Sequence, residues 1–476
     1  MNALAARGVP ARGRVHLVGI GGAGMSAIAR VLTEAGYAVS GSDQRESAVL
    51  TALRALGVSV EIGHRASRVE GADLVIASAA VRPDNVEVAA ATEAGIPVMG
   101  RGEALALLVQ DARTIAVAGT HGKTTTSGMV ATMAQAAGLD PTWLLGADLA
   151  NRGPGGRLGI GTLAVVEADE AYGSFLWLAP QLAVVTNVED DHLDHYGTMQ
   201  ELTAAFERFV ASADEAVILC ADDPRALALA AAASAPVTTY GLGGAHPGSP
   251  ALHEPDVSAA DVQIAASGSS FFLTIGGSPA ARVRLRVAGR HNVQNALGAA
   301  AAGLALGLEP EDVADGLARF AGASRRFEYR GTVRGADLVD DYAHHPTEVA
   351  ATLEAARWGP WRRVIAVFQP HLYSRTQAMW RSFGAALAQA DVVVVTDVYG
   401  AREQPVPGVT GKLIVDAVCE AAPGRQVAYL PRLEEAATYV LGQLRAGDLL
   451  LSMGAGDITT LPTRVMDTDR VERPAP

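Results

Sequence analysis

The chain has 476 residues, 49% of them hydrophobic, and a formal net charge of −13 at pH 7. This length predicts about three domains with a substantial core in each, and the negative charge without a basic face argues against nucleic acid as the main partner. No apolar stretch approaches the length of a membrane-spanning helix, and the N-terminus lacks the apolar core of a signal peptide. With two widely separated cysteines, Cys220 and Cys419, these features predict a cytoplasmic protein without membrane insertion.

Residues 15–43 read as a strand, a glycine-rich turn, a helix and a second strand that ends in an acid. In the turn, Gly19, Gly21 and Gly24 fill the G-x-G-x-x-G pattern, which indicates close approach of the backbone to a diphosphate. The pattern does not identify the nucleoside, because NAD and UDP-sugars both satisfy it. Two more strands, expected at residues 73–80 and 96–100, complete a small doubly wound domain.

A second phosphate-binding pattern follows a hinge expected at residues 111–113. Residues 114–118 predict a buried strand and residues 124–138 a helix, with a tight loop between them. Val117 stands where the full Walker pattern has glycine, so the loop is a shortened form. Lys123 in this loop is one of only two lysines in the chain, and its neighbour Thr124 can offer a hydroxyl to Mg²⁺. The loop therefore predicts a polyphosphate cradle.

Polar residues follow the next two predicted strands, at residues 162–169 and 181–188. Ligands of open parallel sheets bind beyond the carboxyl ends of the strands, so Glu167 is expected beside the phosphate loop, as a Mg²⁺ contact. The Asp- and His-rich residues 190–195 are expected nearby, and their spacing does not favour a zinc site. A Gly- and Pro-rich linker is expected at residues 243–256, followed by two short strands and an alanine-rich helix that ends at Gly307.

From about residue 323 a further α/β unit is predicted, with strands at residues 364–368, 392–398 and 449–452. Polar clusters lie past or between these strands, which favours a ligand-binding face. They comprise residues 340–345, residues 369–371 with Arg375, Asp397 with Tyr399, and residues 454–457. The polar run after Leu461 is expected to be a frayed tail.

The motifs GIGGAGMS, GTHGKTTT, VEADE, GRHNVQNA, SRRFE, DDYAHHPTE, FQPHLYSRT and GAGDI occur in this order. In this order they resemble the Mur ligases, the ATP-dependent amide-forming enzymes of peptidoglycan precursor synthesis. The likeness is greatest to the members that add L-alanine to UDP-N-acetylmuramate. It implies an α/β protein of three domains: residues 1–110, Rossmann-like, for the UDP-sugar; residues 111–322, with the phosphate loop, for ATP; and residues 323–476, Rossmann-like, for the amino acid.

The resemblance also implies roles for single residues. Lys123 would contact the β- and γ-phosphates of ATP, and Arg326 the transferred phosphate. Mg²⁺ would be contacted, directly or through water, by Thr124, Glu167 and His192. Other ATP contacts are expected from Gly119, Thr120, His121, Gly122 and Thr125, and near adenine from His291, Asn292 and Asn295. Substrate contacts are expected from Gly19, Gly21, Gly22, Gly24, Ser42, Asp43 and Ser78 for the uridine diphosphate, and from Tyr342, His344 and Arg375 for L-alanine.

The reaction implied by the resemblance passes through an acyl phosphate, formed when the muramate carboxylate attacks the γ-phosphoryl group of ATP. Two positions depart from the family pattern. Tyr172 stands where an acid is common, and Leu372 where a basic residue is common, so Arg375 is expected to hold the amino-acid carboxylate alone. Neither change touches the phosphate loop.

Three alternatives stay open at this point. A murein-peptide recycling ligase would add a tripeptide to the same UDP-sugar by the same chemistry. An NAD-dependent dehydrogenase would account for the first glycine pattern but not for the second. A regulator could bind a UDP-sugar and ATP without turnover. The protein is expected to be a monomer or a weak homodimer.

Overall fold

The computed structural model describes residues 4, 9–82, 84–243, 254–401 and 403–472. The predicted linker at residues 243–256 falls largely outside the described residues. The chain forms two compact units, one comprising Met1–Val262, Ser270–Leu285 and Asn292–Ala321, the other Gln263–Ser269, Arg286–His291 and Gly322–Pro476. Among the described helices, none combines the length and apolar character needed to cross a membrane.

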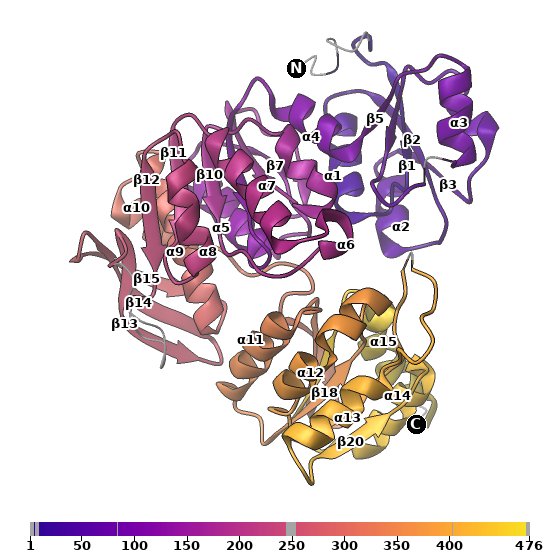
Figure 1. Cartoon of the computed structure of the whole chain (residues 1–476), viewed down its shortest axis with the longest axis vertical. Helices are drawn as coiled ribbons and strands as arrows, with labels where there is room; N and C mark the ends of the chain where they lie inside the picture. The colour runs from indigo at the N-terminus through magenta and orange to yellow at the C-terminus, as the bar shows by residue number, and fades with distance from the viewer. Residues whose placement is uncertain (1–3, 5–8, 83, 244–253, 402, 473–476) are drawn as a thin grey trace. The chain divides into compact units, whose positions relative to one another are not determined.

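The first sheet of the first unit is a five-stranded parallel sheet, drawn in indigo in Figure 1, with the order β3-β2-β1-β4-β5. The strand order reverses beside β1, so the glycine-rich turn after β1 lies at the switch point, where open α/β sheets bind ligands. The predicted doubly wound fold is confirmed. Its elements are β1 (Arg14–Val18), α1 (Ala23–Glu34), β2 (Ala38–Asp43), α2 (Ala48–Ala55), β3 (Ser59–Ile62), β4 (Leu74–Ala77), α3 (Val86–Glu93), β5 (Val98–Gly100) and α4 (Arg101–Val109).

The second sheet has the order β15-β14-β13-β12-β11-β10-β6-β9-β7-β8, and its central strands run parallel. Its apolar core strands are β6 (Arg113–Ala118), β9 (Leu163–Glu167), β10 (Leu182–Val185) and β11 (Ala216–Cys220). The flanking strands are β7 (Thr142–Leu144), β8 (Gly156–Arg157), β12 (Val237–Gly241), β13 (Val257–Ala265), β14 (Gly268–Ile275) and β15 (Ser278–Leu285). The helices are α5 (Lys123–Ala136), α6 (Leu193–Tyr196), α7 (Met199–Ala211), α8 (Pro224–Ala228), α9 (Arg290–Ala305) and α10 (Pro310–Ala318).

Glycines allow the first and second sheets to pack closely within this unit. Gly156 in β8 lies so close to α1 that an added Cβ would come within 2.6 Å of the Ala27 Cα. Gly102 in α4 lies against the Ser174 carbonyl, which an added Cβ would approach to 2.7 Å. A hydrogen bond from the Leu158 amide to Glu34 Oε2, 2.6 Å long, adds to this contact.

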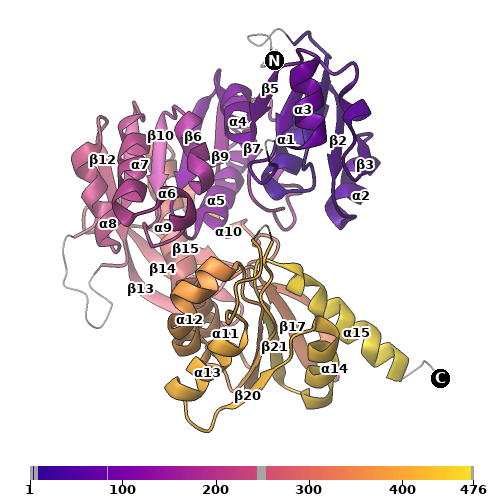
Figure 2. The ribbon, with the colours of Figure 1, turned by 45° about the vertical axis from the view of Figure 1, so that its right-hand side comes forward.

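The second unit is built on the third sheet, of order β16-β17-β21-β18-β19-β20, in which β16 is an antiparallel edge and the other pairs are parallel. The strands are β16 (Glu328–Val333), β17 (Ala336–Asp341), β18 (Arg363–Phe368), β19 (Val392–Val395), β20 (Gln426–Tyr429) and β21 (Asp448–Met453). Figure 2 shows three helices on one face, α11 (Pro346–Arg357), α12 (Tyr373–Leu387) and α13 (Lys412–Ala421), and two on the other, α14 (Leu433–Gln443) and α15 (Leu461–Glu472).

The prediction of a frayed tail after Leu461 was wrong for residues 462–472, which belong to α15, and residues 473–476 lie outside the described residues. Leu461 and Val465 are fully buried in the core under α14 and α15, and Met466 packs against it. Their spacing puts them on one helical face. The polar residues between them occupy the other face, which made the segment read as a tail.

Candidate active site

The glycine-rich turn after β1 is fastened to the neighbouring strand ends. The Gly19 amide donates to the Ser42 carbonyl at 2.9 Å, and the Gly21 amide donates to Asp43 Oδ2 at 2.9 Å. Ser78 lies directly beside the turn, where a Cβ added to Gly19 would come within 3.0 Å of the Ser78 Cβ. The structure therefore brings together the residues predicted to surround the diphosphate, with Gly22 and Gly24 at the start of α1.

The Ser42 side chain points away from that turn. Ser42 is fully buried, and its hydroxyl donates to Glu87 Oε2 at 2.5 Å. Glu87, also fully buried, further accepts the Arg65 amide at 3.1 Å and lies 3.1 Å from His64 Nδ1. Burial alone would raise the pKa of Glu87, but the neighbouring His16, Ser42, Arg65 and His64 lower it to about 2. Ser42 thus serves the turn through its carbonyl, while its hydroxyl belongs to a buried polar cluster.

The phosphate loop joins β6 to α5 through two glycines in the left-handed region, Gly119 with φ 128° and Gly122 with φ 79°. A Cβ on Gly119 would collide with Thr186 Oγ1, and one on Gly122 with Asn295 Oδ1. The Thr120 amide donates to the Asn187 carbonyl at 3.1 Å. The His121 amide donates to Asn187 Oδ1 at 2.8 Å. Close packing on both sides requires glycine at positions 119 and 122 and fixes the loop.

The ammonium group of Lys123 is turned toward carboxylates at the end of β9. Its Nζ lies 2.9 and 3.1 Å from the two carboxylate oxygens of Glu170 and donates to the Gly119 carbonyl at 2.6 Å. Burial would lower the pKa of Lys123, but the charges of Glu170, Asp169 and Glu167 raise it above its usual value. Lys123 therefore carries a positive charge at the end of the phosphate loop, where α5 begins.

Oxygen donors suited to Mg²⁺ lie beside Lys123. Thr124 is buried in the first turn of α5, and the strand register pairs Glu167 with Val117, at the edge where the phosphate loop begins. Glu167 Oε2 accepts the Gly146 amide at 2.7 Å, whereas its Oε1 has no protein donor in the part of the chain that the structure describes. A hydroxyl and a carboxylate oxygen beside a phosphate site fit Mg²⁺.

His192 lies close enough to this acid cluster that its charge helps to lower the pKa of Asp169. The largest effect on Asp169 is burial, which raises its pKa, and Arg101, Lys123 and His192 outweigh it. His192 has a left-handed backbone, φ 55°, at the start of α6. Its imidazole is thus positioned near the predicted metal contacts, where it can act directly or through water.

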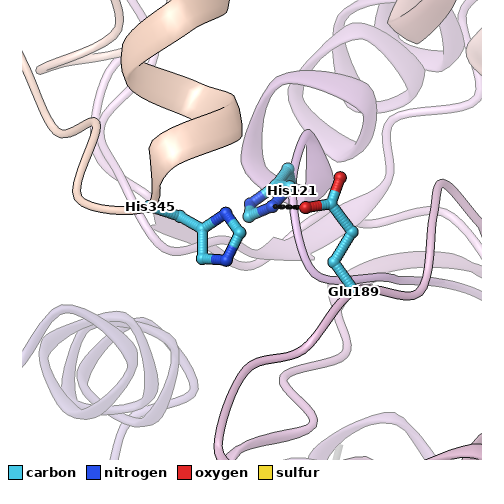
Figure 3. Close-up of side chains that lie close together, drawn as sticks. All are labelled: His121, Glu189 and His345. Atoms are coloured by element: carbon cyan, nitrogen blue, oxygen red, sulfur yellow. Dashed lines mark ion pairs between the residues drawn. The ribbon is translucent and has the colours of Figure 1, made fainter. Parts of the chain in front are cut away.

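His121, in the middle of the loop, has an acidic neighbour. Its Nε2 lies 3.4 Å from Glu189 Oε2, an ion pair marked by the dashed line in Figure 3. Glu189 follows β10, and its amide is held by the Thr120 hydroxyl at 2.8 Å. The loop is therefore tied by two consecutive residues, Thr120 and His121, to the segment after β10.

The predicted adenine contacts begin α9. Asn295 lies against the phosphate loop, since its Oδ1 accepts the Thr126 hydroxyl at 3.4 Å and blocks any side chain at Gly122. Asn292 lies one turn earlier, 3.5 Å from the Asn295 amide nitrogen. His291 belongs to the second unit, where burial, with a smaller contribution from Arg326, lowers its pKa to about 4. The imidazole is therefore neutral at pH 7.

The residues predicted for L-alanine gather at the carboxyl ends of the strands of the third sheet. Arg325 and Arg326 place their guanidinium groups 4.9 and 5.3 Å from the centre of the Tyr342 ring. The ring centres of Tyr342 and His344 are 5.0 Å apart. Glu348 holds the cluster together, with His344 Nδ1 at 3.2 Å and Arg326 Nη1 at 3.6 Å from its carboxylate. These interactions leave a cationic, aromatic surface of the kind that binds a carboxylate.

Arg375 completes this cluster from the first turn of α12. It is 7% exposed, and its Nη1 lies 3.5 Å from His371 Nδ1. The His371 ring is in turn 6.1 Å from that of His344. Leu372, at the position where a basic residue is common, is buried, with a left-handed φ of 71°. The position therefore contributes no charge to the cluster, which leaves Arg375 as its deepest cation.

Two residues near the phosphate loop were missed by the sequence reasoning. Glu170 is the direct partner of Lys123, and Arg101 reaches from α4 to Asp169, with Nη2 2.7 Å from Oδ2. Arg101 immediately follows β5, so the rule that found Glu167, polar residues directly after strands, would have found it as well. Tyr172, the second departure from the family pattern, has a strained backbone with φ 56° and packs its ring against His195 at 5.5 Å.

Three domain families match successive parts of the chain. They are described as "Mur ligase family, catalytic domain" for residues 14–113, "Mur ligase middle domain" for residues 160–303 and "Mur ligase, glutamate ligase domain" for residues 325–456. Similar proteins include the UDP-N-acetylmuramate–L-alanine ligase of Kineococcus radiotolerans, 49% identical over 97% of each chain. The enzyme of the same name from Desulforamulus reducens is 44% identical over 94% of this chain and 96% of its own length.

Solved structures agree with these matches. The UDP-N-acetylmuramate-alanine ligase of Thermotoga maritima has a TM-score of 0.82 and 29% identity, with 97% of this chain and 100% of that chain covered. The murein peptide ligase of Psychrobacter arcticus has a TM-score of 0.73 and 25% identity, with 96% and 98% covered.

Proposed function

Because the chain belongs to the Mur ligase family, we propose that it joins L-alanine to the carboxylate of UDP-N-acetylmuramate with conversion of ATP to ADP and phosphate. The observation that carries the proposal is the similarity, along nearly the whole chain, to relatives of that activity at 43% to 49% identity. The setting we propose is the cytoplasmic synthesis of peptidoglycan precursors.

The proposed reaction has two covalent steps. The muramate carboxylate attacks the γ-phosphorus of ATP, so that a C–O–P linkage forms and ADP leaves. The amine of L-alanine then attacks the acyl carbon, a C–N bond forms, the nitrogen loses its proton and phosphate leaves. A carboxylate is a poor acyl donor, and phosphorylation supplies the leaving group.

Lys123 is proposed to contact the β- and γ-phosphates. Its charge is secured by the surrounding carboxylates, and its Nζ lies among backbone carbonyls of the loop, at Gly119 and Thr120. An approaching triphosphate competes with Glu170 for the ammonium group. Fixed positive charge in a buried loop stabilises charge that moves from the transferred phosphoryl group to ADP.

Thr124 and Glu167 are proposed as the oxygen donors to Mg²⁺, with His192 as a further contact. When bound, Mg²⁺ neutralises phosphate charge and so lowers the cost of bringing a carboxylate to ATP. Burial would raise the pKa of the neighbouring Asp169, but the charges of Arg101, Lys123 and His192 lower it.

Arg375, Tyr342 and His344 are proposed to receive L-alanine, and Arg326 to contact the transferred phosphate. The guanidinium of Arg375 can grip the amino-acid carboxylate with two parallel hydrogen bonds. Its burial favours a small ligand, because the surrounding His371 and Leu372 are fixed by the start of α12.

The test is release of ADP and phosphate by the purified protein with ATP, Mg²⁺, UDP-N-acetylmuramate and L-alanine, with each component omitted in turn. We expect release only with all four. Lys123→Ala should abolish it, whereas Lys412→Ala, which removes the other lysine from an exposed pair with Asp416, should not change it. Release that continues without the UDP-sugar would refute the proposal. Turnover with free tripeptide and not with L-alanine would point instead to the recycling reaction.

A further inference from the structure

The guanidinium group of Arg101 lies between the glycine-rich turn after β1 and the acidic residues beside the phosphate loop. Arg101 is the first residue of α4, directly after β5, and belongs to the first sheet. Its Nη1 lies only 2.5 Å from the position that a Cβ on Gly24 would occupy. Its Nη2 donates to Asp169 Oδ2 at 2.7 Å and to Ser174 Oγ at 3.1 Å, beside the phosphate loop.

The Arg101 side chain is held rigidly in this position. Gly102, the next residue, lies against the Ser174 carbonyl, which an added Cβ would approach to 2.7 Å. Ser174 is itself fixed, because its hydroxyl donates to the Asp169 carbonyl at 2.7 Å. The Nη2 nitrogen of Arg101 is therefore fully used to anchor the side chain.

The Nη1 side of the guanidinium group faces the glycine-rich turn. In the part of the chain that the structure describes, the Nε and Nη1 donors of Arg101 have no protein acceptor, although the side chain is only 20% exposed. Of these two donors, Nη1 lies over Gly24, the third glycine of the diphosphate pattern. Residues 19–24 themselves contain no lysine or arginine, so the turn offers a diphosphate only backbone amides.

We propose that Arg101 binds the diphosphate of the UDP-sugar and is the cation of that site. With Nη2 bound to Asp169 and Ser174, Nη1 can donate a charge-assisted hydrogen bond to a phosphate oxygen above Gly24. The same residue is anchored on Asp169, so one arginine connects the UDP-sugar to the acid cluster around Lys123. A side chain at position 24 would displace the guanidinium group from this place. This inference rests on the proposed function, since it assumes a UDP-linked substrate at the first glycine pattern.

The experiment is equilibrium binding of three ligands to the full-length protein without ATP or L-alanine. The ligands are UDP-N-acetylmuramate, UDP and uridine, measured by titration calorimetry, with uridine by competition. For Arg101→Gln we expect UDP-N-acetylmuramate and UDP to bind roughly tenfold to a hundredfold more weakly, and uridine to bind within about twofold of the parent protein. Arg101→Lys should recover part of the loss, because it restores the positive charge without the anchored Nη1 donor.

Two glycine variants test whether UDP affinity depends on the position of the Arg101 guanidinium group or only on the integrity of the surrounding fold. Gly24→Ala should reproduce the loss of UDP affinity, because its Cβ displaces Arg101. Gly100→Ala is the matched control, since it adjoins Arg101 but an added Cβ there meets nothing within 4 Å. We expect it to bind UDP as the parent protein does.

Several outcomes would overturn the inference. An unchanged UDP affinity in Arg101→Gln would remove Arg101 from the site. An equal loss for uridine would indicate a merely structural role. A loss confined to UDP-N-acetylmuramate would assign Arg101 to the lactyl carboxylate and not to the diphosphate. If the parent protein bound neither UDP ligand, the proposed function itself would fail; normal binding by the parent with no change in the variant would refute the inference alone.

Discussion

The Nζ atom of Lys123 lies 2.9 Å from Glu170 Oε2, and both side chains are largely buried, at 12% and 2% exposure. Before nucleotide binds, the predicted phosphate-binding cation is therefore already paired with a buried carboxyl group, whose pKa is raised by burial against the opposing charge of Lys123. Removal of one member of a buried pair leaves the other charge without compensation, which typically costs about 3–5 kcal/mol.

The Lys123–Glu170 pair gives the first prediction. Lys123→Met and Glu170→Met should each lower the free energy of unfolding by roughly 3 kcal/mol, whereas the double variant should lose less than the sum of the two. Chemical denaturation of the four proteins measures this. Additive losses would show that the pair is not coupled.

Lys123→Ala can destabilise the fold. The activity of this variant must therefore be measured at a temperature at which the variant is folded.

Gly122 gives a second prediction, with a control on the same helix. Gly122 and Gly138 flank α5 and both have φ of 79°, but a Cβ on Gly122 meets Asn295 whereas one on Gly138 meets nothing within 4 Å. Gly138→Ala should cost about 1 kcal/mol of stability for the left-handed backbone alone and leave the KM for ATP unchanged. Gly122→Ala should raise that KM at least tenfold, since Asn295 or the loop must move. Equal kinetics for the two variants would count against the role of Asn295.

Glu87 predicts a particular dependence of stability on pH. Its pKa in the folded protein is about 2, below the ordinary 4.5, so its charge stabilises the fold above about pH 4.5, and this contribution is lost as the pH falls toward 2. The difference amounts to roughly 3 kcal/mol. The gap in unfolding free energy between the parent and Glu87→Gln should narrow over that range. Glu93→Gln, an exposed acid on the same helix, should leave the pH dependence unaltered.

Asp341 predicts the opposite dependence of the free energy of unfolding on pH. Burial, opposed by Arg326 and two backbone amides, raises its pKa from 3.8 to about 6. The folded state then holds a proton that the unfolded state has released, so this group's contribution is full below about pH 3.8 and is lost as the pH rises through 6. Asp341→Asn should therefore gain stability relative to the parent between pH 4 and pH 6.5. A constant difference across this interval would contradict the raised pKa.

The motifs predicted the parts of the site that depend on backbone shape. Glycines at positions 119 and 122, and the apolar strands before them, identified the turns, because only these residues fit such close approaches of the backbone. Several strands were missed, among them the edge strand β3, the short strands β7 and β8, and the buried strand β11. Their pairing is decided by contacts with distant segments, for example Thr142 with Ala164, and short strands carry little periodicity of their own.

Charge pairing was the part of the site that the sequence could not provide. Arg101 and Asp169 are separated by 68 positions, and Lys123 and Glu170 by 47. Which carboxylate of the VEADE motif faces the lysine depends on how the chain turns after β9. The carbonyl of Ser42 lies against the turn, but the orientation of its hydroxyl toward Glu87 depends on α3, which no motif describes.

The close packing of Gly156 on Ala27 has a consequence for the recombination of such proteins. Because an added Cβ at Gly156 would come within 2.6 Å of the Ala27 Cα, β8 and α1 form a seam with no room for exchange of side chains. A chimera that took residues 1–110 from one relative and the remainder from another would inherit this seam from two parents. A chimera should fold well only if one parent supplies glycine at position 156 and the other supplies a small residue at position 27 of α1. The overall sequence identity of the two parents should matter less.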